Sequence, residues 1–338
     1  MLAPCVSPEV AIQTTPMEET RNIPELAVLR SSREPRTGHL TILRELNREE
    51  YGKYQASRRL VTHFVDEYLK FTMTRRSYNE YVRLLRAYDQ EFSVERPLDE
   101  IKAMAIKQEV NRRLRGFLTE MRSFLDHAET SLKHEYGKEA KEVTGFLKAR
   151  SQIFDSSPSY RLVNKLRDYA LHRNLAIQNM TYTSKPNKET GEPQSRLSFH
   201  LDKDELLQTN FTWTKHVRPY LENLPARFKL DPHIQIAMYL LEQVNVALVA
   251  ARLPKTKEAA RYINELAESV QEPGTPCVVF NAPGRTSEES EVQHIKPVID
   301  EIPTYIAALI EKLPESDELL KLPGLQIDFV FKDDAQSG

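Results

Sequence analysis

The sequence predicts a mainly α-helical protein: an antiparallel helical bundle with a β-hairpin and a smaller C-terminal α+β portion. Three observations lead to this prediction. Apolar residues recur at helical spacing through most of residues 44–174. Residues 176–202 change to strand-like patterns on either side of a loop rich in turn-forming residues. The segments 275–284 and 325–333 have the composition of short strands, and they enclose one last helix near 291–313.

Size and composition indicate an ordinary soluble protein. The chain has 338 residues and a formal net charge of −2, so no global field draws it to nucleic acid or to an anionic membrane. The two cysteines, Cys5 and Cys277, provide neither a disulfide framework nor a zinc motif. No phosphate-binding loop, dinucleotide-binding, zinc-protease or serine-hydrolase motif occurs. We therefore expect a cytoplasmic protein without cofactor, metal or membrane contact.

The helical region begins after a segment without periodicity. Residues 1–38 mix Pro, Thr, Ser and charged residues, and we expect a mostly disordered leader there. Asp99 is placed to cap a long helix over 99–135, and Gly137 to end it. Two apolar stripes at helical spacing precede that helix: Leu60, Phe64, Tyr68 and Phe71, then Tyr78, Val82, Leu85 and Tyr88.

A second well-marked helix follows. Ser157 and Pro158 form a typical helix start, and Asn174 suits a left-handed C-cap after Arg173. Beyond the hairpin we expect two helices, at about 231–252 and 255–271. The first is interrupted by polar residues such as Glu242 and is typical of a core helix rather than a membrane span. Residues 39–175 and 176–338 then form two regions, or the second belongs to the same domain.

The segment "KLRDYALHRNLAI" at the end of that helix gathers Arg167, Asp168 and His172. Asp168 and His172 stand four residues apart, on one helix face, where a carboxylate can orient an imidazole. A guanidinium matches phosphate oxygens, and an imidazole can move protons at neutral pH. Together they are the minimum set for cutting RNA without a metal. The spacing alone is weak evidence, because the R-x4-H pattern occurs three times in the chain.

Helix geometry restricts this hypothesis. Five residues correspond to about 140° around a regular helix, so Arg167 and His172 cannot easily reach one phosphate. Either the helix unwinds near Asn174, or two copies meet across a two-fold axis and form a composite site in a homodimer. The alternative interpretation is structural: charged residues flank the core stripe of any amphipathic helix.

The stretch "YRLVNKLRDYALHRNLAI" resembles the end of the motif helix in HEPN-domain proteins. Their signature is an arginine, a polar residue and then a histidine, and Arg167, Asp168 and His172 match these positions. Asp168 departs from the commoner asparagine. The upstream "NRRLRGFLTEMRSFLDH" also looks like the preceding helix of bacterial HEPN-like proteins.

The resemblance implies a HEPN-like helical bundle over residues 39–175 that dimerises around its motif. It also implies a metal-independent endoribonuclease with Arg167, Asp168 and His172 as catalytic residues and RNA as substrate. Such proteins act in toxin–antitoxin, phage-defence and stress systems, so an antitoxin or regulatory protein is an expected partner. Other members have lost activity, and the rival hypothesis is a non-catalytic module for dimerisation and for partner or nucleic-acid binding.

Further RNA-binding candidates lie on the long helix. Arg122 and His127 have the same spacing as the motif pair and would line its groove. Arg112, Arg113 and Arg115 form the densest basic cluster, which can track an RNA backbone or merely face solvent.

Overall fold

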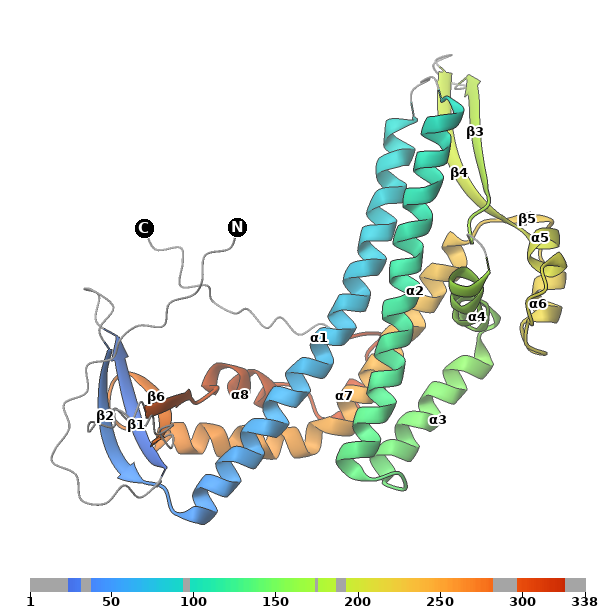
Figure 1. Ribbon diagram of the computed structural model, residues 1–338. Helices are drawn as coiled ribbons and strands as arrows, with labels where there is room; N and C mark the ends of the chain where they lie inside the picture. Colours follow the sequence, from blue (N-terminus) through green and yellow to red (C-terminus); the bar gives the residue numbers. More distant parts are fainter. Residues whose placement is uncertain are drawn as a thin grey trace, which may run out of the picture. The chain divides into compact units, whose positions relative to one another are not determined.

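The computed structural model describes residues 24–31, 38–93, 98–173, 176–186, 193–281 and 297–325. Most of them lie in helices, and small antiparallel sheets account for the strands (Figure 1). The chain divides into two compact units. Unit 1 comprises Met1–Val65, Leu253–Pro314 and Phe329–Gly338, and unit 2 comprises Asp66–Arg252 and Glu315–Asp328.

Unit 2 contains most of the helices and a three-stranded sheet in the order β3-β4-β5. Two long helices, α1 and α7, contribute residues to both units. The elements of unit 2 in chain order are α1 (Arg48–Glu91), α2 (Glu100–Tyr136), α3 (Lys141–Ser156), α4 (Pro158–His172), β3 (Asn179–Pro186), β4 (Pro193–Asp202), α5 (Lys203–Gln208), α6 (Arg218–Glu222), β5 (Arg227–Phe228), α7 (Asp231–Glu268) and α9 (Ser316–Leu319).

Aromatic contacts show that α1 and α2 pack antiparallel. Phe71 lies against Phe124 with ring centroids 5.2 Å apart, and Tyr78 lies against Phe117 at 5.7 Å. The second pair is seven residues later on α1 and seven residues earlier on α2, which is two turns along each helix in opposite directions. The expected caps of α2 are confirmed: Asp99 accepts a hydrogen bond from the Lys102 N–H, and Gly137 has a φ of 86°. The expected antiparallel helical packing is therefore present.

The predicted hairpin over residues 176–202 is confirmed as β3 and β4, which pair from Asn179 opposite His200 to Pro186 opposite Pro193. Leu197, Phe199 and Leu201 alternate on one face of β4 and are buried, as their spacing predicts. These side chains join the same core as α2, α4 and the first half of α7. The hairpin thus belongs to the helical unit, and the structure does not divide the chain at residue 175.

One continuous helix, α7, replaces the two helices expected at 231–252 and 255–271, although Pro254 lies inside it. Proline has no N–H to donate to the carbonyl of Ala250, four residues earlier. The hydroxyl of Ser316 donates to that carbonyl at 2.9 Å. The predicted break is wrong because a residue distant in sequence supplies the missing hydrogen bond.

By length and composition alone, α7 could also cross a membrane. No other helix in the described ranges is both long and apolar enough to do so. However, 56% of the most apolar window of α7 is buried inside the protein. Leu241, Val244 and Leu253 have no exposed surface. This burial is typical of a core helix in a soluble protein.

Unit 1 contains a four-stranded antiparallel sheet in the order β2-β1-β6-β7. Ala27 on β1 and Cys277 on β6 stand opposite each other and are fully buried. The strands and the remaining helix are β1 (Glu25–Ser31), β2 (Gly38–Glu45), β6 (Thr275–Asn281), β7 (Pro297–Glu301) and α8 (Thr304–Glu311).

Several expectations change in unit 1. Residues 25–31 form the strand β1, so the expectation of a disordered leader over residues 1–38 is wrong for this segment. The sequence did not indicate it because β1 pairs with β6, which comes from a distant part of the chain. Residues 1–23 and the strand expected at 325–333 lie outside the described residues, except for Leu325. Residues 275–281 of the strand expected at 275–284 are confirmed as β6, and residues 282–284 lie outside the described ranges. Within the helix expected near 291–313, residues 297–301 instead form β7, and the helix α8 begins at Thr304.

Candidate functional site

The motif helix α4 begins where its sequence predicts. The Ser157 hydroxyl accepts a hydrogen bond from the Tyr160 N–H at 3.2 Å, and Pro158 occupies the first turn. Leu162, Leu166 and Tyr169 form the fully buried face of the helix. The core contacts of these three residues fix the rotation of α4, and the charged residues of the motif emerge on either side of them.

The end of α4 is held by an arginine from α2. Arg115 donates a hydrogen bond to the Ala170 carbonyl at 2.9 Å. The last carbonyls of a helix lack partners within the helix and carry a partial negative charge, so a guanidinium stabilises this end. Arg115 is therefore occupied in positioning the motif, and Asn174 lies outside the described residues.

The motif carboxylate lies beside two cations on its own helix. Arg167 donates to one oxygen of Asp168 at 3.2 Å, and Lys165 donates to the other at 3.1 Å. Burial raises the pKa of the Asp168 carboxyl, but these hydrogen bonds outweigh it, and the net pKa is below the ordinary value. His172 is exposed at the end of the helix. Asp168 thus orients Arg167, whereas the expected Asp168–His172 hydrogen bond is not formed in the described part of the chain.

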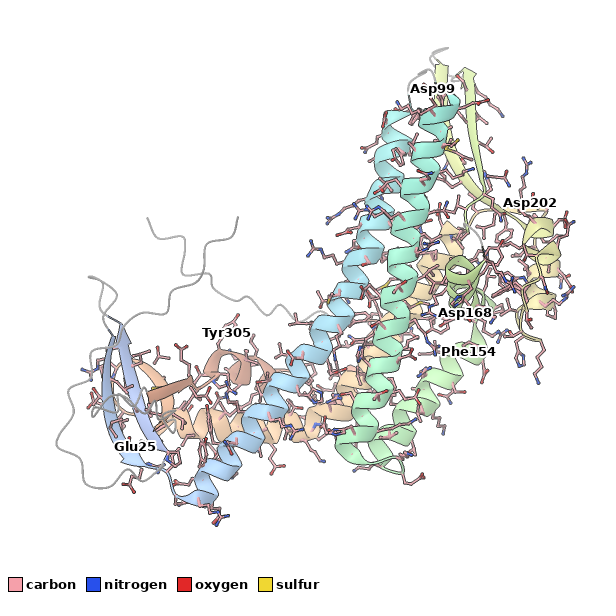
Figure 2. All side chains as sticks on the ribbon, in the orientation of Figure 1. Glu25, Asp99, Phe154, Asp168, Asp202 and Tyr305 are labelled. Carbon is pink, nitrogen blue, oxygen red and sulfur yellow. The ribbon has the colours of Figure 1, made fainter. Side chains whose placement is uncertain are left out.

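A groove of about 500 Å³ runs between α2, α3 and α4, and Asp168 lies on its wall. Figure 2 labels Asp168 on α4 and Phe154 on α3, which both border the groove. Four cations and two carboxylates line it: Arg122, Arg150, Arg161, Lys165, Glu129 and Asp168. Phe154 adds partly exposed aromatic surface, whereas Tyr160 is only 1% exposed. Arg167, His172 and His127 are not part of this lining.

All four groove cations are held in place by neighbours, Lys165 by Asp168. Arg150 pairs with Glu129 at 2.6 Å, and Arg161 donates to the Asp155 carbonyl at 2.6 Å. Arg122 pairs with Asp126 at 2.9 Å, on the exposed side of α2. The sequence pattern indicated Arg122 but not Arg150, Arg161 or Lys165. Arg150 lies on α3, whereas Arg161 and Lys165 lie on α4, and the packing of these helices against α2 brings them to one groove.

The basic cluster of α2 is largely neutralised. Arg112 makes two hydrogen bonds to Glu109, at 2.7 and 2.6 Å, and Arg113 contacts both Glu109 and Glu80. These arginines lower the pKa of the Glu109 carboxyl to about 2. Because Arg115 binds a carbonyl, the three arginines do not form the open cationic patch that their sequence suggested.

A buried polar cluster that the sequence did not reveal joins α4, α6 and α7. The Ser159 hydroxyl lies 2.9 Å from Nδ1 of His233 and 3.3 Å from the Tyr220 hydroxyl. Burial lowers the pKa of His233, which therefore stays neutral at neutral pH. Ser159 itself is 7% exposed, so these contacts hold the three helices together rather than present a nucleophile to solvent.

The acidic segment after β4 has a structural role. The Asp202 side chain accepts hydrogen bonds from the N–H groups of Asp204 and Glu205 and so caps α5. Within the described ranges, no three histidine, cysteine or acidic side chains lie close enough together to hold a metal ion. No protein-family model, curated protein or solved structure matches this chain.

Proposed function

We propose that the protein is an RNA-binding helical module and that the α2–α3–α4 groove, lined by Arg122, Arg150, Arg161 and Lys165, holds the ligand. The observation that supports this proposal is that four cations and two carboxylates line one groove, beside the partly exposed ring of Phe154. Arginines held in place by neighbours need little reordering to bind a phosphate. Aromatic surface can stack on unpaired bases.

Single-stranded RNA is preferred to a duplex as the ligand because the groove is small and has an aromatic side chain on its wall. Single-stranded RNA offers splayed bases as well as phosphates, whereas a duplex presents mainly its backbone. The resemblance of the motif helix to HEPN proteins also favours RNA. The overall charge of −2 means that such binding depends on this local groove.

Binding of a labelled single-stranded 20-nucleotide RNA, measured by fluorescence anisotropy, tests the proposal. We expect Arg161→Ala and Lys165→Ala each to weaken binding about tenfold, since each removes a charge-assisted contact. Arg112→Ala is the control, because Arg112 belongs to the same unit but does not line the groove. Equal affinity of all three variants would refute the groove as the RNA site.

A second candidate function is metal-independent endoribonuclease activity in a homodimer. It is favoured by the exposure of His172 and by the fixed position of Arg167 beside Asp168. One α4 directs Arg167 and His172 about 140° apart, so a site requires the arginine of one copy and the histidine of the other. His172 would move the proton of the 2′-hydroxyl or of the leaving oxygen, and Arg167 would stabilise the charge on the phosphate.

Mixing variants separates a composite site from a site within one chain. Cleavage of labelled RNA in EDTA is measured for the parent, for Arg167→Ala, for His172→Ala and for a refolded mixture of the two variants. Each variant alone should be inactive. The mixture should recover roughly a quarter of the parental rate, because half the dimers are mixed and each mixed dimer has one complete site. An inactive parent would refute the nuclease function and leave RNA binding standing; a toxin or phage-defence role depends on this activity.

A further inference from the structure

Unit 2 has a second concave site, away from the α2–α3–α4 groove. A pocket of about 190 Å³ lies between α1, β4 and the start of α7. Its walls combine apolar side chains, among them Tyr78, Leu85, Phe199 and Ile234, with as many polar and charged ones. This volume is below the range of drug-sized ligand pockets and suits one flat ring system rather than a peptide.

A partly buried carboxylate lies on the wall of this pocket. The Tyr81 hydroxyl donates to Oδ1 of Asp231 at 2.9 Å, and Tyr81 is only 1% exposed. In the described part of the chain this is the only hydrogen bond that Asp231 accepts, which leaves Oδ2 available to a ligand. Burial raises the pKa of the Asp231 carboxyl, and a donor group on a ligand would offset that cost.

Cations border the same pocket. Arg86 on α1 and Lys229 just before α7 are exposed, and neither has an ion-pair partner among the described residues. Arg196 on β4 also lines the pocket, but its guanidinium lies 4.0 Å from the Asp89 carboxylate, which partly neutralises it. The pocket therefore combines an acceptor inside, aromatic and aliphatic walls, and two unpaired cations at its border.

We propose that this pocket binds a nucleoside monophosphate whose base carries an exocyclic amino group. The base lies between Tyr78 and the aliphatic wall, its amino group donates to Asp231, and its phosphate contacts Arg86 and Lys229. Two cations suit a phosphate dianion better than the single carboxylate of an amino acid. Aromatic walls are typical of base-binding sites. This site is separate from the RNA groove and does not depend on it.

Isothermal titration of the full-length protein with GMP, IMP, guanosine, inorganic phosphate and tryptophan tests the proposal. GMP and IMP differ by one exocyclic amino group. We expect GMP to bind about tenfold more tightly than IMP, since a hydrogen bond to a charged group is lost. Guanosine should bind more weakly than GMP because it lacks the phosphate. Asp231→Asn should remove the preference for GMP over IMP.

Variants at exposed residues test the phosphate contact with little effect on folding. Arg86→Ala and Lys229→Ala should each weaken GMP binding about tenfold. Arg83→Ala, an exposed arginine one turn away on α1, should leave it unchanged. The groove variant Arg161→Ala should also leave GMP binding unchanged. Absence of GMP binding, equal binding of inorganic phosphate or tryptophan, or insensitivity to both Arg86→Ala and Lys229→Ala would overturn the proposal.

Discussion

Replacement of Asn111 by leucine should destabilise unit 2 strongly. Asn111 on α2 is 5% exposed and pairs with the backbone of Ile177, the segment that follows the motif helix. Its carbonyl oxygen accepts from the Ile177 N–H at 2.9 Å, and its amide donates to the Ile177 carbonyl at 2.8 Å. A third hydrogen bond, at 2.9 Å, goes to the Lys107 carbonyl within α2.

The size of the stability loss follows from the backbone groups of Ile177 that would lose their hydrogen-bond partners. Leucine keeps the branched heavy-atom shape of asparagine, although it is larger, and it removes the partners of two backbone groups of Ile177, which is fully buried. Each buried group without a partner costs about 1–3 kcal/mol. Some of this cost is recovered by burial of the leucine side chain, so we expect Asn111→Leu to lower the free energy of unfolding by about 3 kcal/mol.

The single tryptophan of the chain provides the assay. Trp213 lies in unit 2, is 5% exposed and stacks on Tyr169 of the motif helix, with ring centroids 5.7 Å apart. Its fluorescence during urea unfolding therefore reports on the unit that contains Asn111. Asn223→Ala, at an exposed asparagine, is the control. A loss below about 0.5 kcal/mol for Asn111→Leu would refute the reasoning.

Three further predictions concern other buried groups. Asn245 has no exposed surface, and among the residues that the structure describes neither of its amide atoms has a hydrogen-bond partner. Asn245→Leu should therefore raise the free energy of unfolding by about 1–3 kcal/mol in the same urea assay. A loss would show that the amide has an essential partner. Burial lowers the pKa of His233, so the unfolded state binds the proton more readily, and stability should fall as pH drops below about 6.5. His233→Asn should reduce this pH dependence, and an unchanged slope between pH 7.5 and 5.5 would contradict it. Burial raises the pKa of the Cys277 thiol to about 11. In a Cys5→Ser variant, a thiol reagent should therefore react with Cys277 only as the protein unfolds. Rapid reaction of the folded protein would show that the thiol is accessible.

Features encoded by neighbouring residues were predictable from the sequence. Asp99 and Ser157 cap their helices as expected, because a cap needs only the three following residues. The alternation of Leu197 and Phe199 likewise predicted the strand β4. The apolar stripe of α4 predicted which face is buried, and therefore where Arg167 and Asp168 emerge.

Features that depend on distant residues were not predictable. Pro254 signals a helix end, and only the contact between Ser316 and Ala250 reverses that expectation. The groove requires Arg150 and Lys165 from different helices to meet, which no spacing rule indicates. In the motif itself, i,i+4 spacing pointed Asp168 toward His172, whereas Lys165 and Arg167 are closer and bind both carboxylate oxygens.

The sheet of unit 1 has a consequence for synthesis of the chain. Its central strands, β1 and β6, come from opposite halves of the sequence, so β1 has no long-range partner while most of unit 2 is being made. During translation, β1 and β2 therefore form an exposed two-stranded ribbon, which is marginally stable alone and prone to pairing with other chains. We expect truncation before Thr275 to cause aggregation through β1, although the helical core of unit 2 is largely complete by then.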